Sequence, residues 1–97
     1  MNKEIKTKWL KALRSKRYKQ TVGTLCGMNG GYCCLGVLAR IQGAKKENLF
    51  NRGTLKADLA KYAAGLRIQS QNILTNLNDV EGYNFIQIAD YIEKKYK

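Results

Sequence analysis

Three cysteines, Cys26, Cys33 and Cys34, are the residues of this 97-residue chain best suited to nucleophilic or metal chemistry. The chain contains no histidine, so a thiol lacks the commonest general base and the commonest additional metal ligand. Three thiolates cannot complete a tetrahedral zinc site, and no carboxylate lies near them in sequence. We therefore expect thiols that serve packing, with no bound metal and no cofactor. Their reactivity stays open.

The acidic residues are few and scattered, which argues against the usual acid–base and magnesium-dependent enzymes. Asp79 and Glu81 are close in sequence, but both fall in an expected turn. Gly27, Gly30 and Gly31 lack the lysine and the serine or threonine that a phosphate-binding loop requires. The sequence therefore predicts a binding protein and not an enzyme.

Positive charge is concentrated at the start of the chain. The net charge is +11, from 18 basic and 7 acidic residues. Residues 1–20 hold eight of the basic residues against one acidic residue, Glu4. Such a concentration attracts phosphates and speeds association with anionic partners. A basic face that only keeps the protein in solution is the competing interpretation.

The run from Arg14 to Gln20 combines the groups that a nucleotide or a nucleic-acid backbone needs. Arginine and lysine pair with phosphate, tyrosine stacks on a base, and serine and glutamine supply hydrogen bonds. The predicted ligand-binding residues are Lys11, Arg14, Ser15, Lys16, Arg17, Tyr18, Lys19 and Gln20. A half-buried strand residue is the alternative interpretation of Tyr18.

Residues 55–77 offer a second binding surface, because they resemble a helix-turn-helix. Ala60, Gly65 and Leu66 match its small residue, turn glycine and following aliphatic residue, although Ala60 and Gly65 are one residue further apart than usual. The side chains expected to read base edges are Gln69, Gln71, Asn72, Thr75 and Asn76. The motif holds few cations to anchor phosphates, so an ordinary pair of core helices competes with this interpretation.

The elements that position these residues are expected to form one α+β domain over residues 1–97. The spacing of Ile5, Trp9 and Leu13 predicts an N-terminal helix that ends near residue 15 or 16. Residues 18–34 are predicted to form a β-hairpin, because strand-forming segments flank a reversal at Asn29-Gly30-Gly31.

Four mostly short helices are expected to follow the hairpin and to pack on one core. The first runs from about Cys34 to Gly43 and is apolar almost all round, hence buried. Thr54 and Ser70 are expected to cap the next two helices, with Ile73 pointing inward. Asn84 with Gln87 has the form of a capping box for the last helix, and Leu49 and Phe50 are expected to tuck into the core from a polar loop.

No targeting or membrane segment is visible in the sequence. No apolar run approaches the length of a membrane span, and the basic residues 1–16 are not followed by the apolar segment of a signal peptide. The sequence therefore predicts a cytoplasmic protein with no membrane partner. Its oligomeric state stays open.

Several short motifs are spread over nearly the whole chain. They are Trp9, Ala12 to Ser15 (Ala-Leu-Arg-Ser), Tyr18 with Gln20, Cys33 to Leu38 (Cys-Cys-Leu-Gly-Val-Leu), Leu77 to Asp79 (Leu-Asn-Asp) and Phe85 to Glu93 (Phe-x-x-Ile-Ala-Asp-Tyr-Ile-Glu). With this set the chain resembles a family of small proteins encoded by bacteriophages and prophages. Lys16 departs from the pattern, which has glycine after Arg-Ser, and residues 39–41 replace a more acidic or cysteine-containing continuation.

The resemblance implies a viral setting in a host cytoplasm and supplies no active site to transfer. Small phage proteins without catalytic groups are often inhibitors of host defence. A basic member suits binding of guide or target nucleic acid, as an anti-CRISPR-like protein, or sequestration of a signalling nucleotide. The leading hypothesis is thus a non-enzymatic binding protein whose basic surface engages nucleic acid or a nucleotide and inhibits antiviral defence. A helix-turn-helix-like transcriptional regulator and an inhibitor that binds a host defence protein without nucleic acid are the alternatives.

Overall fold

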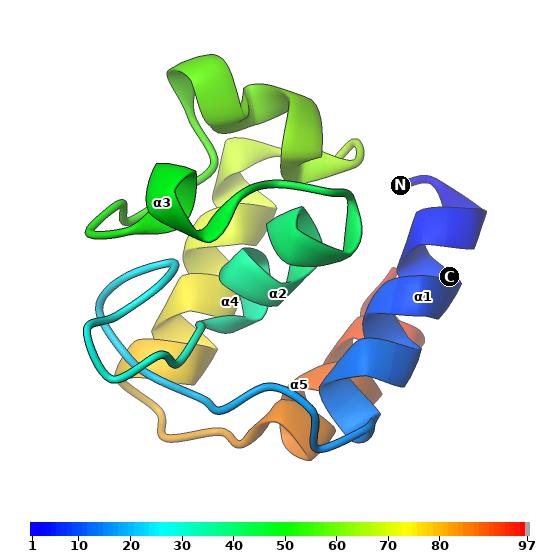
Figure 1. Ribbon diagram of the computed structural model, residues 1–97. Coiled ribbons are helices and arrows are strands. Elements are labelled where there is room, and N and C mark those ends of the chain that lie inside the picture. Colours follow the sequence, from blue (N-terminus) through cyan, green and yellow to red (C-terminus); the bar gives the residue numbers. More distant parts are fainter. Residues whose placement is uncertain (97) are drawn as a thin grey trace.

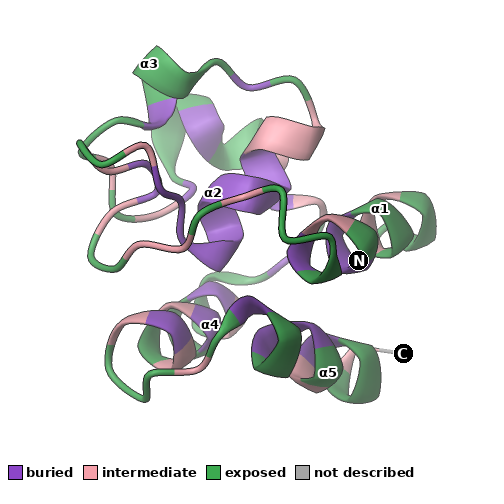
Figure 2. Ribbon diagram, turned by 60° about the horizontal axis from the view of Figure 1, so that its bottom comes forward, coloured by how far each residue is buried: buried purple, intermediate pink, exposed green. Residues whose placement is uncertain are grey.

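The computed structural model describes residues 1–96 and shows a mainly helical protein (Figure 1). The elements are α1 (Lys3–Arg14), α2 (Cys34–Ile41), α3 (Lys46–Leu49), the 3₁₀ helix η1 (Ala57–Ala63), α4 (Ile68–Asp79) and α5 (Phe85–Lys95). α2 is the central helix, because it packs against α1, α4 and η1. α1 also packs along α5, and α5 contacts α4. Figure 2 shows the buried residues of these helices turned toward one another.

The predicted α+β class with a β-hairpin is wrong. Residues 18–34 form an irregular loop, and the described residues contain only isolated bridges and no sheet. Tyr32 bridges Gln20 in the parallel sense and Cys26 in the antiparallel sense, which two hairpin strands cannot do. Leu25 donates its backbone N–H to the carbonyl of Arg52 at 2.6 Å. The segment around Leu25 therefore pairs in part with a distant loop.

The predicted N-terminal helix is confirmed. The side chain of Asn2 caps α1 by accepting the N–H of Ile5 at 3.0 Å. Trp9 and Leu13 are buried on the inner side of the helix. The indole N–H of Trp9 donates to the carbonyl of Cys34 at 2.9 Å, and this buried bond ties α1 to the first residue of α2.

The predicted second helix is also confirmed, and its first six residues are buried. A Cβ added at Gly36 would overlap the carbonyl oxygen of Leu25. Leu25 is itself fully buried, and its carbonyl accepts the N–H of Cys33 at 3.3 Å. The loop thus crosses α2 so closely that only a glycine fits at position 36.

The following helices differ from the prediction in their starts. η1 begins after Lys56 and α4 begins after Arg67, so neither Thr54 nor Ser70 provides the expected cap. The capping box of α5 is confirmed: Asn84 Oδ1 accepts the Gln87 N–H at 2.8 Å, and Gln87 Oε1 accepts the Asn84 N–H at 2.9 Å.

Two apolar residues that were expected to be buried are partly exposed to solvent. Phe50 is 41% exposed and Ile73 is 45% exposed, whereas Leu49 is buried as expected. Ile73 points outward because α4 turns the amide side chains of Gln71 and Asn78 into the core, where they bond to loop backbone. None of the helices formed by residues 1–96 has the length and apolar character needed to cross a membrane.

Gly36→Ala is expected to lower the free energy of unfolding by about 3 kcal/mol, since the new methyl group must displace loop backbone. Gly53→Ala is the matched control, because a Cβ there meets no heavy atom within 4 Å. Urea unfolding followed by circular dichroism measures both variants. Equal stability of the two variants would show that the crossing at Gly36 is not tight.

Candidate anion-binding site

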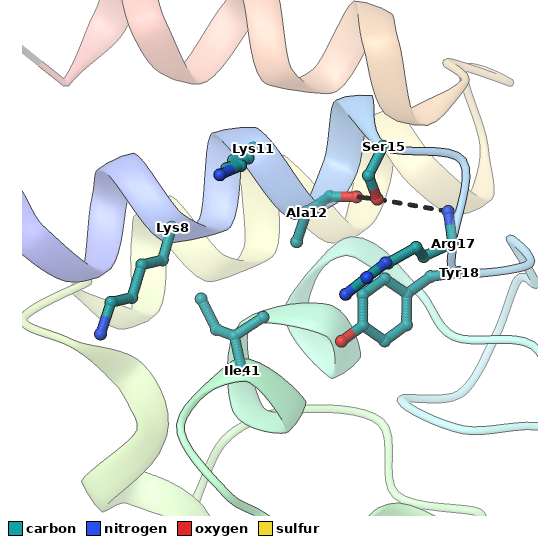
Figure 3. Close-up of a pocket in the computed structure, with 7 residues that line it drawn as sticks. All are labelled: Lys8, Lys11, Ala12, Ser15, Arg17, Tyr18 and Ile41. Atoms are coloured by element: carbon teal, nitrogen blue, oxygen red, sulfur yellow. Dashed lines mark hydrogen bonds between the residues drawn. The ribbon is translucent and has the colours of Figure 1, made fainter.

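A pocket of about 520 Å³ opens beside the C-terminal half of α1 (Figure 3). Its lining residues are Lys8, Lys11, Ala12, Ser15, Arg17, Tyr18 and Ile41. The pocket therefore brings together four of the residues predicted to bind a ligand: Lys11, Ser15, Arg17 and Tyr18. Lys8, Ala12 and Ile41 were not predicted.

α1 and the end of α2 provide two walls of the pocket. Lys8, Lys11 and Ser15 are spaced three and four residues apart, so they lie on one face of α1. Ile41 is the last residue of α2 and lies across from Ala12 in Figure 3. The helical spacing to Lys11 and Ser15 would have pointed to Lys8, whereas only the packing of α2 on α1 reveals Ile41.

A backbone turn directly after α1, at Ser15 and Lys16, places Arg17 and Tyr18 at the pocket. The hydroxyl of Ser15 donates to the carbonyl of Ala12 at 2.7 Å and accepts the N–H of Arg17 at 3.2 Å. Lys16 between them has a φ of 64°, in the left-handed region that favours glycine. Ser15 therefore shapes the backbone at the rim.

Tyr18 is held in place by a second aromatic ring. Its ring meets that of Tyr32 edge to face, with centroids 5.7 Å apart and an interplanar angle of 83°. Tyr32 is buried and Tyr18 is half-buried, so part of the Tyr18 ring is anchored while the residue lines the pocket. An aromatic ring fixed in this way is a ready surface for stacking.

Three positive charges surround the hollow without a protein partner. Within residues 1–96, the side chains of Lys8, Lys11 and Arg17 make no ion pair and no hydrogen bond to another side chain. Figure 3 shows Lys8 on one side of the pocket and Arg17 with Tyr18 on the other. Like charges around one hollow create a positive potential that an anion relieves.

Arg14 lies outside this pocket and serves the fold. Its guanidinium donates to Asp90 at 2.8 Å and to Glu93 at 2.9 Å. These hydrogen bonds raise the pKa of Arg14 above its ordinary value. The predicted phosphate contact of Arg14 therefore competes with an ion pair that joins α1 to α5. Lys16 and Lys19 are exposed beside the pocket and outside its lining.

Gln20 also serves the fold. Its amide N–H groups donate to Asn78 Oδ1 at 2.9 Å and to the carbonyl of Tyr83 at 2.8 Å. Asn78 is buried, and its own amide donates to the carbonyl of Thr21 at 2.8 Å. These bonds fasten the loop that follows Tyr18 to the turn between α4 and α5. The Tyr-x-Gln and Leu-Asn-Asp motifs thus meet in one hydrogen-bond network.

The cysteines lie in the core, as expected for thiols that serve packing. Cys26, Cys33 and Cys34 are buried and unpaired in disulfides. Burial raises the pKa of Cys33 to about 11 and the pKa of Cys34 well above its ordinary value. A buried thiol that keeps its proton at neutral pH is a poor nucleophile.

The expected helix-turn-helix surface is only partly exposed. Gln71 is 2% exposed: its Oε1 accepts the N–H of Leu55 at 3.3 Å, and its Nε2 lies 3.4 Å from the carbonyl of Leu66. The expectation that Gln71 is exposed is therefore wrong. Thr75 is half-buried, while Asn72 and Asn76 are exposed. The helix before the turn, η1, is a 3₁₀ helix of seven residues.

The chain belongs to the family described as Domain of unknown function (DUF8296), which matches residues 1–63. The matched region contains α1, the loop at 18–34 and α2, and so includes every residue that lines the pocket. No curated protein and no solved structure matches the chain.

Gln20→Ala is expected to lower the free energy of unfolding by about 1 to 3 kcal/mol, because it leaves the buried Oδ1 of Asn78 without its donor. Gln69→Ala, on an exposed position of α4, is expected to change stability little. Thermal and urea unfolding compare the two. A Gln20→Ala protein as stable as the unmodified chain would contradict the structural role of Gln20.

Lys16→Gly is expected to raise the free energy of unfolding by about 0.5 to 1 kcal/mol, since glycine adopts positive φ without a Cβ clash. Lys16→Ala removes the same charge and keeps the backbone cost, so it separates the two effects. Urea midpoints of the three proteins give the answer. A gain with alanine as large as that with glycine would assign the effect to charge.

Proposed function

We propose that this protein is a non-catalytic nucleic acid-binding protein whose pocket beside α1 seats one nucleotide of a single strand. One observation carries the proposal: Lys8, Lys11 and Arg17, without protein partners within residues 1–96, surround a hollow that Tyr18 also lines. Cations recruit the phosphates, and the ring stacks on the base.

The two sides of the pocket suit the two ends of a nucleotide. Tyr18 and Ile41 offer aromatic and aliphatic surface for the base, while Lys8 and Lys11 offer ammonium groups for phosphate. The volume of about 520 Å³ falls within the range of small-ligand pockets, roughly 300 to 1,000 Å³. Stacking of one base on an aromatic side chain contributes about 1 to 3 kcal/mol.

A strand suits the surface better than a free nucleotide. Lys16 and Lys19 are exposed and flank Arg17 and Tyr18 in sequence, so they add positive charge next to the pocket for further phosphates of a strand. The net charge of +11 strengthens attraction to a polyanion. A free nucleotide shares the same chemistry inside the pocket, and it serves as a separate arm of the test.

The proposed setting is a phage-infected cell, where the protein would inhibit an antiviral defence in the host cytoplasm. This part of the proposal rests on the resemblance of the chain's motifs to those of phage and prophage proteins and on the basic pocket. Binding guide or target nucleic acid would make the protein anti-CRISPR-like. Withdrawal of a signalling nucleotide would use the same pocket.

The two other hypotheses have less support. Gln71 is buried, so it cannot read bases as the helix-turn-helix hypothesis requires. In addition, α4 contains no lysine or arginine to anchor phosphates. An inhibitor that binds a host protein through its basic face fits the charge, but it gives no role to the Tyr18 ring. Survival of a complex after nuclease treatment would favour the protein partner.

Arg17→Glu is expected to weaken binding of a short single-stranded oligonucleotide by about tenfold to a hundredfold, because a charge-assisted contact becomes a repulsion. Thermal stability should stay unchanged, since no residue of the described chain pairs with the Arg17 side chain. Fluorescence anisotropy at fixed salt measures the affinity, with duplex DNA and free nucleotides as parallel ligands.

Lys94→Glu is the matched control for this experiment. It makes the same change of charge on α5, which lies on the opposite side of α1 from the pocket in Figure 3. Equal losses in the two variants would show that net charge and not the pocket drives binding. If a free nucleotide binds tightly and the oligonucleotide binds weakly, the ligand of the pocket is a nucleotide and not a strand.

A further inference from the structure

A second pair of an aromatic ring and a cation lies on η1, outside the pocket beside α1. The ammonium of Lys61 lies 5.3 Å from the centroid of the Tyr62 ring. Tyr62 is half-buried against the core, and Lys61 is exposed. Within residues 1–96 Lys61 makes no ion pair, because the carboxylate of Asp58, three residues earlier, pairs with Arg52 at 2.8 Å. The charge of Lys61 is therefore left for a ligand, as are the charges of the pocket.

A hydrogen bond joins this pair to a wall of the pocket. Ile41 lines the pocket, and the side-chain amide of the next residue, Gln42, donates to the carbonyl of Tyr62 at 2.6 Å. The same amide lies 3.1 Å from the carbonyl of Leu38 on α2, which fixes its position. The backbone of Tyr62 is thus one glutamine side chain away from the end of α2, where the pocket has its wall.

η1 also ends beside the start of α1, the helix that forms the other wall. The backbone N–H of Asn2 donates to the carbonyl of Ala64 at 3.2 Å, and Figure 1 shows the turn after η1 close to the N-terminus. A helix rises about 1.5 Å per residue, so the pocket follows α1 for about 10 Å from Ser15 to Lys8, toward that end. Tyr62 therefore lies beyond the Lys8 end of the pocket, away from Tyr18.

We propose that Tyr62 and Lys61 form a second subsite, which binds a neighbouring nucleotide of the strand whose base stacks on Tyr18. The inference rests on the proposed function and extends it, because it makes the ligand a strand that spans both rings. A contact between an exposed ammonium and a ring is weak, so Lys61 is free to turn to a phosphate while the ring of Tyr62 receives a base.

The two subsites favour an unpaired strand. Bases of a single strand expose their faces and stack on successive aromatic side chains, whereas the bases of a duplex stack on one another. Lys8 lies between the two ends of this surface and is placed to pair with a linking phosphate. Single-stranded nucleic acid is therefore the class of ligand that uses Tyr18, Lys8 and Tyr62 together.

The test compares thymidine monophosphate with oligothymidylates of two to about eight nucleotides, by calorimetry at fixed salt. The affinity of the unmodified protein should rise with length. Lys61→Glu should weaken binding of the longest strand about tenfold and binding of the mononucleotide less than about twofold, because the mononucleotide needs only the pocket. Tyr62→Ala should act in the same direction, and Tyr62→Phe should bind normally because it keeps the ring.

Two variants on α5 are the matched controls. Lys94→Glu makes the same change of charge as Lys61→Glu. Tyr91→Ala removes a half-buried tyrosine that, like Tyr62, has an interaction partner for its ring, here Tyr96 at 6.2 Å between centroids. Both should bind the longest strand within about twofold of the unmodified protein. Circular dichroism checks the fold of every variant, and Lys61→Glu decides the question if Tyr62→Ala does not fold.

Two results would overturn the second subsite. One is a loss of strand affinity in Lys61→Glu no larger than that in Lys94→Glu, and the other is an affinity that does not rise beyond a single nucleotide. Failure of the pocket itself shows in a different variant, because Arg17→Glu would then leave the binding of every ligand unchanged. The second subsite and the proposed function are therefore told apart by Lys61→Glu and Arg17→Glu.

Discussion

The crossing of the 18–34 loop over α2 at Gly36 is the constraint on which the rest of the structure depends. The backbone of Leu25 lies where any side chain at position 36 would be. The indole of Trp9 bonds to the carbonyl of Cys34 and fixes α1 beside the same helix. Together these contacts set how α1 faces the end of α2, and those two segments form opposite walls of the basic pocket.

Most of the motif residues that the sequence marks as ligand-binding candidates instead form hydrogen bonds or ion pairs within the protein. Gln20 bonds to Asn78, and Arg14 pairs with Asp90 and Glu93. The hydroxyl of Ser15 holds the backbone turn before Arg17. The charges left for a ligand come from side chains that the fold does not use. Several motif residues thus maintain the fold, while Lys8, Lys11 and Arg17 are left without a side-chain partner among residues 1–96.

Local patterns predicted α1 and the start of α5, because the spacing of Ile5, Trp9 and Leu13 and the capping box of Asn84 are properties of short segments. The hairpin prediction failed because Asn29-Gly30-Gly31 signals a reversal but not which segments pair. Leu25 bonds to Arg52, a partner that no local pattern identifies. The site was half predictable for the same reason: Lys11 and Arg17 stand out by charge, whereas Ile41 joins them only through the packing of α2 on α1.

The most direct test of the account is amide chemical-shift mapping by NMR, with a short single-stranded oligonucleotide added to the isotope-labelled protein. The account predicts that the largest shifts fall on Lys8, Lys11, Arg17, Tyr18 and Ile41, two segments far apart in sequence that meet only at the pocket. Largest shifts on α4, or small shifts spread evenly over the basic surface, would contradict it.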